Sequence, residues 1–589
     1  MAIDGVTLSC CRYDLENEII GARVDKAYQP ESDFLTLRLR HKKENPVLLT
    51  TIDPRQSRIH LTKIDFSNPS EPPVFAMVLR KHLRNGQIKE IEQPGMERML
   101  IIKIASNNKI YKLIAEIMGR YSNVILVDEE NTVLDAMKRI PPEKDSNRVL
   151  MPNVKYEPPP PQNKADPYEL TPERWEEITR TNSNETAYRV ILNNIQGFGP
   201  DIAREIIYQA GGEPDVNFAE FDQKQMKNIK KKLFHFLQRI KQDDYEPTLG
   251  LNSKGHIEYQ SAFPLYHRED LDHKYFASTH LMFDYFYENH IVKKDRERKR
   301  KRLQDIINKY QDKNEEQQKI LKGKLQQSKE ADKYKRRGEL LKANLHRVDK
   351  GQEEIEVIDY YQEDQPEITI PLDGDISPSD NVDKLFKKYY KLKKSRDHLV
   401  KELARFRHEE KYLSQVELEV NQAETLSELD EIEEELISEG YIQQQSQKSS
   451  KQKQQTSKPR KFFSSDGYQI LIGRNNRQND RLTKKVASSK DIWVHTKEIA
   501  GSHVIIRNHQ PDKEIPESTI KEAALLAAYY SKARQSENVP VDYTKVRDVK
   551  KPSGAKPGIV YYDNHKTFYV NPDETEVKEI AKNEKPDHL

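Results

Sequence analysis

Residues 382–413 read VDKLFKKYYKLKKSRDHLVKELARFRHEEKYL, and their spacing sets the architecture of the chain. Apolar and aromatic residues recur at alternating steps of three and four, as in the seam of a coiled coil. The seam positions are Val382, Leu385, Tyr389, Leu392, Arg396, Leu399, Leu403, Phe406 and Leu413, with Glu410 as an interruption. This pattern predicts a long exposed helix.

An earlier stretch carries a weaker copy of the same pattern. Its seam positions are Leu303, Ile307, Tyr310, Asn314, Gln317 and Leu321. Two such arms with a break between them are expected to pair as an antiparallel hairpin, and arms of about 40–50 residues are roughly 60–75 Å long. The break contains the short β-like runs EEIEVIDYY and PEITIPLDGDISPSDN. We expect these runs to form a small cap at the tip, at about residues 350–380.

Composition agrees with an extended, multidomain chain. Of 589 residues, 35% are hydrophobic and 33% are charged, which is too polar for one continuous globule. The two cysteines, Cys10 and Cys11, are adjacent, so neither a disulfide framework nor a cysteine zinc knuckle is expected. A reducing, cytoplasmic location is the corresponding expectation. The N-terminus does not read as a secretory signal, and no stretch approaches the ~18 consecutive apolar residues of a membrane span.

The predicted fold class is α+β with several domains. We expect an N-terminal α/β module at 1–160, a mainly helical domain at 172–270, the coiled-coil hairpin at 275–435, a flexible linker at 440–460 and a C-terminal α/β module at 461–589. In the first module, strands are predicted at DFLTLRLR, NPVLLTTI, MLIIKIA, KIYKLIAEIM and NVILVD, and a helix at PPVFAMVLRKHL. In the last, FFSSDGYQILIGRN predicts a hairpin, IWVHT and HVIIRN predict strands, TIKEAALLAAYYSKAR predicts a helix, and GIVYYDNHKTFYV predicts a second hairpin turning at Asp563-Asn564.

Gly197 and Gly199 punctuate the helical segment NIQGFGPDIAREII. Two glycines around a tight turn are typical of a helix-hairpin-helix, whose backbone N–H groups can bind a phosphate. An ordinary turn between two helices explains the same residues. Both interpretations stay open at the level of sequence.

The C-terminal stretch DIWVHTKEIAGSHVIIR, residues 491–507, holds a tryptophan and two histidines. His495 and His503 lack further ligands at metal-binding spacing, and Ser502 next to His503 lacks the other members of a catalytic set. A packed core around Trp493 is the simplest explanation. The preceding GRNNRQNDRLTKKVASSKD predicts a loop rich in amides and cations, which suits phosphate and base-edge contacts, although a solvated charged loop has the same composition. KKPSGAKPGIV adds Lys550, Lys551 and Lys556 on a rigid loop.

Two polar stretches of the N-terminal module admit both a structural and a functional interpretation. AEIMGRYSNVILVD places Arg120, Ser122 and Asn123 between two strands, as a β-bulge or as a small RNA-binding cluster. PGMERML places Glu97 and Arg98 after a turn, where a charged pair is usually just solvated. Residues 293–302 read KKDRERKRKR, and eight of these ten are basic. On an exposed helix they would attract phosphates or simply be solvated.

These motifs together resemble the NFACT family. NPSEPPVFAMVLRKHL, EIMGRYSNVILVD, the Gly197–Gly199 turn, the coiled-coil arms, GRNNRQND, DIWVHTKEIAGSHVIIR and KPSGAKPGIVYY all recur there in this order. The resemblance covers nearly the whole length. It implies NFACT-N, helix-hairpin-helix, coiled-coil and NFACT-R domains, the last of which binds RNA in the family.

The resemblance also implies a function. NFACT proteins recognise large ribosomal subunits, through rRNA and ribosomal proteins, that still hold a peptidyl-tRNA after a stalled ribosome splits. They recruit a charged tRNA, alanyl-tRNA in bacteria, and the nascent chain is extended without message before it is degraded. The ribosome makes the peptide bonds. The implied protein is therefore a cytoplasmic, RNA-binding, non-enzymatic factor, monomeric on the subunit, with no cofactor, no metal and no membrane partner.

Site residues follow from matching motifs. The family's acidic N-terminal residue matches Asp4, and its Asp-Arg pair, needed for tailing, matches Glu97 and Arg98, with glutamate in place of aspartate. The tRNA-binding and tailing set is completed by Glu116, Gly119, Arg120, Ser122 and Asn123. The RNA-binding set of the C-terminal module is Arg474, Asn475, Asn476, Asn479, Asp480, Trp493, His495, Lys497, Gly501, Ser502, His503, Lys551 and Gly554.

The family resemblance also points to two other functions. Some family members are described as fibronectin-binding surface proteins, so adhesion is the alternative. The N-terminal fold of the family also resembles base-excision DNA glycosylases, which use an N-terminal Pro followed by Glu; this chain has Ala2 and Ile3 and lacks the cysteines of their zinc finger. Glycosylase chemistry is therefore not expected.

Overall fold

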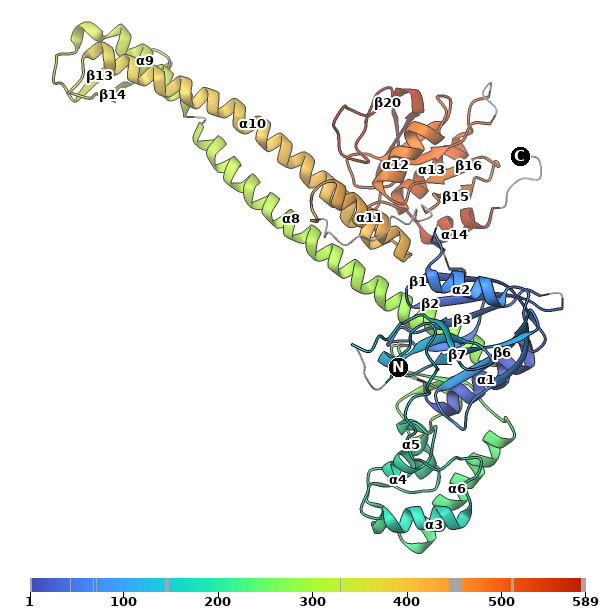
Figure 1. Ribbon diagram of the computed structural model, residues 1–589. Helices are drawn as coiled ribbons and strands as arrows, with labels where there is room; N and C mark the ends of the chain where they lie inside the picture. The colour runs from blue at the N-terminus through green and yellow to red at the C-terminus, as the bar shows by residue number, and fades with distance from the viewer. Residues whose placement is uncertain are drawn as a thin grey trace. The chain divides into compact units, whose positions relative to one another are not determined.

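The computed structural model describes residues 3–42, 44–66, 68–69, 71–143, 148–328, 330–443, 457–509 and 513–583. The chain divides into two compact units, residues 1–295 with 448–455 and residues 296–447 with 456–589. Figure 1 shows the elements of each unit. The mixed α/β, multidomain character predicted from the sequence is confirmed, and every strand pairing inside the sheets is antiparallel.

The first unit is built on a nine-stranded sheet in the order β4-β3-β2-β1-β5-β6-β7-β8-β9. Its strands are β1 (Arg23–Glu31), β2 (Phe34–Arg40), β3 (Val47–Thr51), β4 (Arg58–Thr62), β5 (Gln87–Glu92), β6 (Met99–Ser106), β7 (Lys109–Glu116), β8 (Asn123–Val127) and β9 (Val133–Ala136). All five predicted strands are present. Alternate residues of β6 are buried, because successive side chains point to opposite faces of a sheet.

Helices α1 (Gly5–Ile19), α2 (Val74–Leu83) and α7 (Thr279–Phe286) pack into the core of this sheet. Leu8 and Leu15 of α1 and Phe283 of α7 are fully buried there. A π-helical turn, Tyr287–Val292, follows α7. The beginning of the segment predicted as a coiled-coil hairpin, 275–435, is therefore part of the core of the first unit.

A second core belongs to the helical part of this unit. It is formed by α3 (Pro172–Thr181), α4 (Ala187–Asn194), α5 (Pro200–Gln209) and α6 (Gln223–Lys241), with the three-stranded sheet of β10 (Thr248–Leu251), β11 (Ile257–Ser261) and β12 (Asp272–Tyr275). Trp175 and Phe218 meet edge to face in this core. These helices and strands fill the range predicted as a mainly helical domain, 172–270, and β12 extends it to residue 275.

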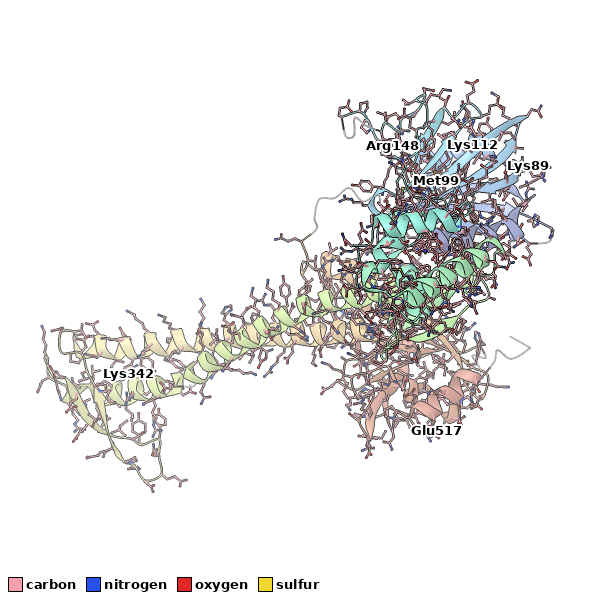
Figure 2. All side chains as sticks on the ribbon, turned by 90° about the horizontal axis from the view of Figure 1, so that it is seen from below. Lys89, Met99, Lys112, Arg148, Lys342 and Glu517 are labelled. Carbon is pink, nitrogen blue, oxygen red and sulfur yellow. The ribbon has the colours of Figure 1, made fainter. Side chains whose placement is uncertain are left out.

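The second unit begins with the helical hairpin. Its elements are α8 (Lys293–Ser328), α9 (Ala331–Ala343), α10 (Pro378–Gln422) and α11 (Leu426–Ser438), with β13 (Glu354–Ile358) and β14 (Glu367–Pro371) at its far end (Figure 1). Lys342, at the end of α9, lies near that tip (Figure 2). Two long helical arms with a pair of short strands between them are present, and the first arm begins at Lys293 and not at residue 275.

Contacts between the arms run antiparallel. Gln311 Nε2 donates to Glu417 Oε2 at 3.2 Å, and Gln318, further along α8, donates through Nε2 to Glu410 Oε2, earlier on α10, at 2.9 Å. Asn314 lies at the same place, where its Oδ1 accepts from Gln318 Nε2 at 2.8 Å. Leu303 and Ile307 pack in one apolar cluster with α10 and α11. The seam interruption at Glu410 is thus matched by amides on the opposite arm, with Gln318 in the buried position that the sequence pattern assigned to Gln317.

The C-terminal module is a six-stranded sheet in the order β15-β16-β18-β17-β19-β22. Its elements are β15 (Arg460–Phe463), β16 (Gln469–Ile472), α12 (Asn476–Arg481), β17 (Ile492–Thr496), β18 (Val504–Ile506), α13 (Glu517–Tyr529), β19 (Val539–Lys545), β20 (Val549–Lys550), β21 (Tyr561–Tyr562), β22 (Lys566–Val570) and α14 (Glu574–Lys582). One face of the sheet packs on α13, and the other carries the Trp493 cluster.

Two local predictions for this module are wrong. The segment after Gly473 is α12 followed by a π-helical turn, Leu482–Val486, and not a loop, because Asn475 caps the helix by accepting from Gln478 N at 2.9 Å. The closing hairpin at Asp563-Asn564 does not form. β21 pairs with β20 and β22 pairs with β19, since Tyr562 turns onto Trp493, with ring centroids 4.7 Å apart.

Most of the predicted linker at 440–460 lies outside the described residues. Its last described part is held in place, because Ser457 Oγ donates to Glu431 Oε2 at 2.9 Å.

Candidate nucleic-acid interface

Asp4 joins the first helix to the glycine turn. Its carboxylate accepts from Thr7 N at 2.8 Å, which caps α1, and from Gly199 N at 3.2 Å, which holds the turn between α4 and α5. Burial raises the pKa of Asp4, and the hydrogen bonds from Thr7 and Gly199 oppose that rise. The N–H of Gly199, a predicted phosphate donor, is therefore already bonded within the protein.

The turn needs glycine for two reasons. Gly197 has φ +83°, and a Cβ there would lie 2.3 Å from Met96 Cβ. A Cβ on Gly5 would lie 2.6 Å from Gly197 Cα. The close approach of these backbones brings α1, the turn after β5 and the α4–α5 turn to one place.

A cavity of about 270 Å³ opens where these three segments meet. Asp4, Glu97, Arg98, Gly197 and Gly199 all line it, so the structure brings together residues that lie far apart in the sequence. Both charge types face the same small space.

Glu97 and Lys164 are the anchored charges of this cavity. Glu97 Oε1 accepts from Gln196 Nε2 at 2.6 Å, and Lys164 Nζ donates to the Leu192 carbonyl at 2.9 Å. Burial lowers the pKa of Lys164, the Glu97 charge raises it and the Arg98 charge lowers it further. Among the described residues, no hydrogen bond or ion pair engages the Arg98 guanidinium, which leaves it available to an anionic or carbonyl-bearing ligand.

The segment 116–123 adjoins Arg98, because Ile117 N donates to the Arg98 carbonyl at 2.8 Å. Within it Glu116 is fully buried and accepts from Arg148 Nη1 at 3.0 Å and from Tyr156 Oη at 2.8 Å. Figure 2 labels Arg148 and Met99 in this unit; Tyr156 Oη also lies 3.2 Å from Met99 Sδ. Burial, with the Glu116 charge, raises the pKa of Tyr156. Glu116 thus holds the strands together and does not face solvent.

The remaining residues of the segment 116–123 are either buried and structural or exposed and available to a ligand. Ser122 Oγ accepts from Met118 N at 2.8 Å, and Asn123 Nδ2 donates to the Lys138 carbonyl at 2.8 Å. Both side chains are buried, and they fix a turn in which Gly119 has φ +60°. The turn presents Arg120 to solvent, with its guanidinium 4.6 Å from the ring of Tyr121. Arg120 and Tyr121 are the groups that could contact RNA.

In the C-terminal module, the amide-rich motif is bonded to the acidic helix α11. Asn475 Nδ2 donates to Glu431 Oε2 at 2.6 Å, and Asn476 Nδ2 donates to Glu435 Oε1 at 3.0 Å. Arg474 forms an ion pair with Glu428. These three side chains are used to attach the module to the base of the hairpin.

Asn479 and Asp480 serve the interior of the same module. Asn479 Oδ1 accepts from His503 N at 3.1 Å. Asp480 accepts from Gly558 N at 3.2 Å and pairs with Lys551.

The Trp493 cluster is a core. Trp493 is completely buried and stacks against His495, with ring centroids 5.5 Å apart. Burial, followed by the nearby His495, lowers the pKa of His503 to about 3, and burial lowers that of His495. Both rings are neutral at neutral pH and cannot act as cations toward phosphate. This agrees with the simplest interpretation of the stretch 491–507, a packed core around Trp493.

Ser502 is also buried, and Gly501 is bonded to the hairpin, since its N–H donates to Gln415 Oε1 at 2.8 Å. Lys497 and Gly554 are the members of this set that are exposed. Gly554 has φ +76° with open space at its Cβ position.

The structure adds residues that sequence reasoning missed. Lys164 lines the cavity beside Arg98, Gln196 holds Glu97 by a hydrogen bond, and Arg148 and Tyr156 hold Glu116. The run of glutamates in α11 was a usable signal, because an acidic amphipathic helix predicts a cationic or amide-rich partner. Among the described residues, no cluster of three or more His, Cys, Asp or Glu side chains has the arrangement of a metal site, and no helix is long and apolar enough to cross a membrane.

Two family models match the chain, and they meet within the predicted linker at 440–460. Residues 4–455 match the family model for NFACT N-terminal and middle domains, and residues 458–563 match that for the NFACT protein RNA binding domain. The chain is 38% identical to the Rqc2 homolog RqcH of Bacillus subtilis (strain 168), over 99% of this chain and 100% of that protein. It is 26% identical to the human ribosome quality control complex subunit NEMF, over 41% of this chain and 22% of that protein. The crystal structure of the fibrinogen binding protein from Staphylococcus aureus aligns with 49% of this chain and 99% of that one, at 29% identity and a TM-score of 0.41. The two family models together span almost the whole length, and the chain therefore belongs to the NFACT family.

Proposed function

We propose that this protein is a ribosome quality control factor that binds large ribosomal subunits obstructed by peptidyl-tRNA. In this role it recruits alanyl-tRNA and promotes C-terminal alanine tailing of the stalled chain, without message. The full-length similarity to RqcH carries the proposal, because it spans the sheet unit, the hairpin and the RNA-binding module in one order. The protein acts in the cytoplasm as a monomer on the subunit, and the ribosome makes the peptide bonds.

The cavity beside Arg98 supports a positioning role for the first unit. Arg98 lies beside Asp4, Glu97 and the Gly197–Gly199 turn, and Arg120 is presented by the neighbouring segment. Paired acceptors and cations in a cavity of this size suit polar contacts to a tRNA. The longer side chain of Glu97, in place of the family's aspartate, reaches Gln196, so Arg98 is the member of the pair left to make the contact.

Arg98→Ala tests this proposal. A charge-assisted hydrogen bond contributes about 1.5–3 kcal/mol, so alanine tailing by the variant on purified obstructed subunits should fall about 10- to 100-fold. Arg84→Ala is the matched control, because Arg84 is exposed in the same unit and precedes β5, whereas Arg98 lies beyond the other end of that strand. Tailing that survives Arg98→Ala, or falls equally in both variants, would refute the role of this cavity.

Association with subunits is tested separately in sucrose gradients. The protein should sediment with large subunits in preference to intact ribosomes, and its bound RNA should be enriched in alanine-accepting tRNA. Stronger association with intact ribosomes would contradict the rescue role. Surface adhesion predicts that protease treatment of intact cells removes the protein, whereas the proposed function predicts that it is protected.

A further inference from the structure

The C-terminal module has a cationic groove that contains none of the residues in the RNA-binding set implied by the family resemblance. It has a volume of about 520 Å³ and is lined by five cations and one carboxylate, Glu514. The cations are Lys490, Lys513, Lys545, Arg547 and Lys566. All five are exposed, and within the described part of the chain only Arg547 makes an ion pair, with Asp548 at 3.8 Å.

The sheet fixes the position of this groove. Ile492 pairs with Lys545 across β17 and β19, and Tyr543 pairs with Lys566 across β19 and β22. Directly opposed residues share a face of a sheet, and so do residues two apart on one strand. Ile492, Tyr543, Lys545 and Lys566 therefore lie on one face, where β17 and β22 begin and β19 ends.

This face is opposite to the one that carries Trp493. Ile492 and Tyr543 pack with the core under α13, whereas Trp493, one residue further along β17, belongs to the other core. The Trp493 side lies against the hairpin base, where Gln415 of α10 bonds to Gly501. Helix α10 thus contacts the face that carries Trp493, whereas the groove on the α13 face stays open.

We propose that this groove binds the sugar–phosphate backbone of RNA. Lys545 and Lys566 are diagonal neighbours, roughly 7–8 Å apart at Cα, and with Lys490 they present a row of charges that an anionic polymer would neutralise. Asn564 and Tyr543 add an amide and an aromatic ring beside the charges, the groups that contact riboses and bases once phosphates are bound.

A second cavity in this unit fits RNA less well. The space of about 350 Å³ between α10 and the module is lined mainly by apolar and aromatic groups, with Lys411 balanced by Glu498. It lacks the excess of positive charge that the groove has, so the groove is the site for an RNA backbone.

The test uses the full chain and a labelled tRNA transcript. Three lost phosphate contacts reduce the slope of log affinity against log salt by about 2. Between about 50 and 200 mM salt, wild type should therefore lose about 16-fold more affinity than the variant Lys490→Ala/Lys545→Ala/Lys566→Ala. The control is Lys458→Ala/Lys461→Ala/Lys578→Ala, three exposed lysines of the same module outside the groove, which should keep the wild-type slope.

Two results would overturn the proposal. One is equal affinity and slope for the groove variant and the control variant, with unchanged melting temperatures. The other is displacement of the tRNA by poly-L-glutamate as effective as displacement by unlabelled tRNA, which would make the groove a site for acidic peptides. Ultraviolet crosslinks that map to the peptides containing Lys490, Lys545 and Lys566 would support it independently.

This inference deepens the proposed function, because it names where the RNA backbone is held. The inference about the groove can nonetheless fail while the proposed function stands. The RNA affinity of the isolated chain tests the groove, whereas the tailing activity of the Arg98→Ala variant tests the cavity of the first unit.

Discussion

Glu116 belongs to a family motif, and its surroundings predict that it stabilises the fold and does not contact RNA. Its carboxylate is completely buried and is bound by Arg148 and Tyr156, while the Arg148 side chain is 16% exposed. Removing one partner of a buried ion pair costs about 3–5 kcal/mol, because the other charge is left unpaired. The partial exposure of Arg148 places Glu116→Gln near 3 kcal/mol by this measure.

That loss is large enough to measure by thermal unfolding. At about 2–4 °C for each kcal/mol in a domain of this size, Tm of the first unit should fall by roughly 6–12 °C. The matched control is Glu130→Gln, since the Glu130 side chain is 78% exposed and lies 3.9 Å from Lys155. An exposed pair contributes about 0–1 kcal/mol, so its Tm should change by no more than about 4 °C.

A double variant tests the physical reason. Glu116→Gln/Arg148→Met removes the unpaired charge as well, and apolar replacement of a whole buried pair is often neutral. Most of the lost stability should therefore return. Differential scanning calorimetry of the full chain gives all four values. A Glu116→Gln chain with unchanged Tm and abolished tailing would refute the structural role and make Glu116 a contact residue.

Asp4→Asn should destabilise the first unit by about 1–2 kcal/mol, since one of the two acceptors for Thr7 and Gly199 becomes a donor; an unchanged urea midpoint would contradict this. Glu419→Gln should flatten the pH dependence of stability. Burial, with the Glu435 charge, raises the pKa of Glu419 well above its ordinary 4.5. The folded chain then holds a proton that the unfolded chain has released, so stability falls as pH rises from the unfolded pKa to the raised folded one. Urea midpoints from acid to neutral pH should decline less in the variant, and equal declines would show that Glu419 is not the titrating group.

The extended hairpin was predictable because its information is local. Leu399 and Leu403 are buried at the seam positions that the heptad pattern assigns to them. The pattern repeats along one helix, and its partner arm repeats the same pattern. No knowledge of distant contacts was needed to infer the pairing.

The helix at 476–481 was not predictable from the same kind of pattern. Its side chains are polar, and polarity alone favours a loop. Asn475 and Asn476 are buried because glutamates of α11, more than 40 residues earlier, accept their hydrogen bonds. The separation of β21 from β22 has a similar origin, since the Tyr562 ring packs on Trp493 and its hydroxyl donates to Asp542 Oδ2 at 2.8 Å.

The sequence predicted which residues belong to the candidate site, but it did not predict what each of them does. Resemblance selected Asp4, Glu97, Arg98 and the two glycines of the turn, and the structure places them around one cavity. Resemblance cannot separate residues kept to build a surface from residues that form it. Burial and bonding make that separation.

In both units the family-motif residues fall into a buried, structural group and an exposed, charged group. Glu116, Asn123, Asn476 and Trp493 are enclosed and bonded or packed within the chain, so their substitution should act through stability. Of the cations in the two site sets implied by the family resemblance, Arg98, Arg120 and Lys497 are those for which no ion pair is found among the described residues, whereas Arg474 and Lys551 are paired. If RNA is bound through charge, the two proposals made above assign its salt dependence to these side chains and to the cationic groove. The family motif of the C-terminal module then acts mainly by attaching the module to the hairpin, and the groove on the opposite face supplies the charge that holds RNA.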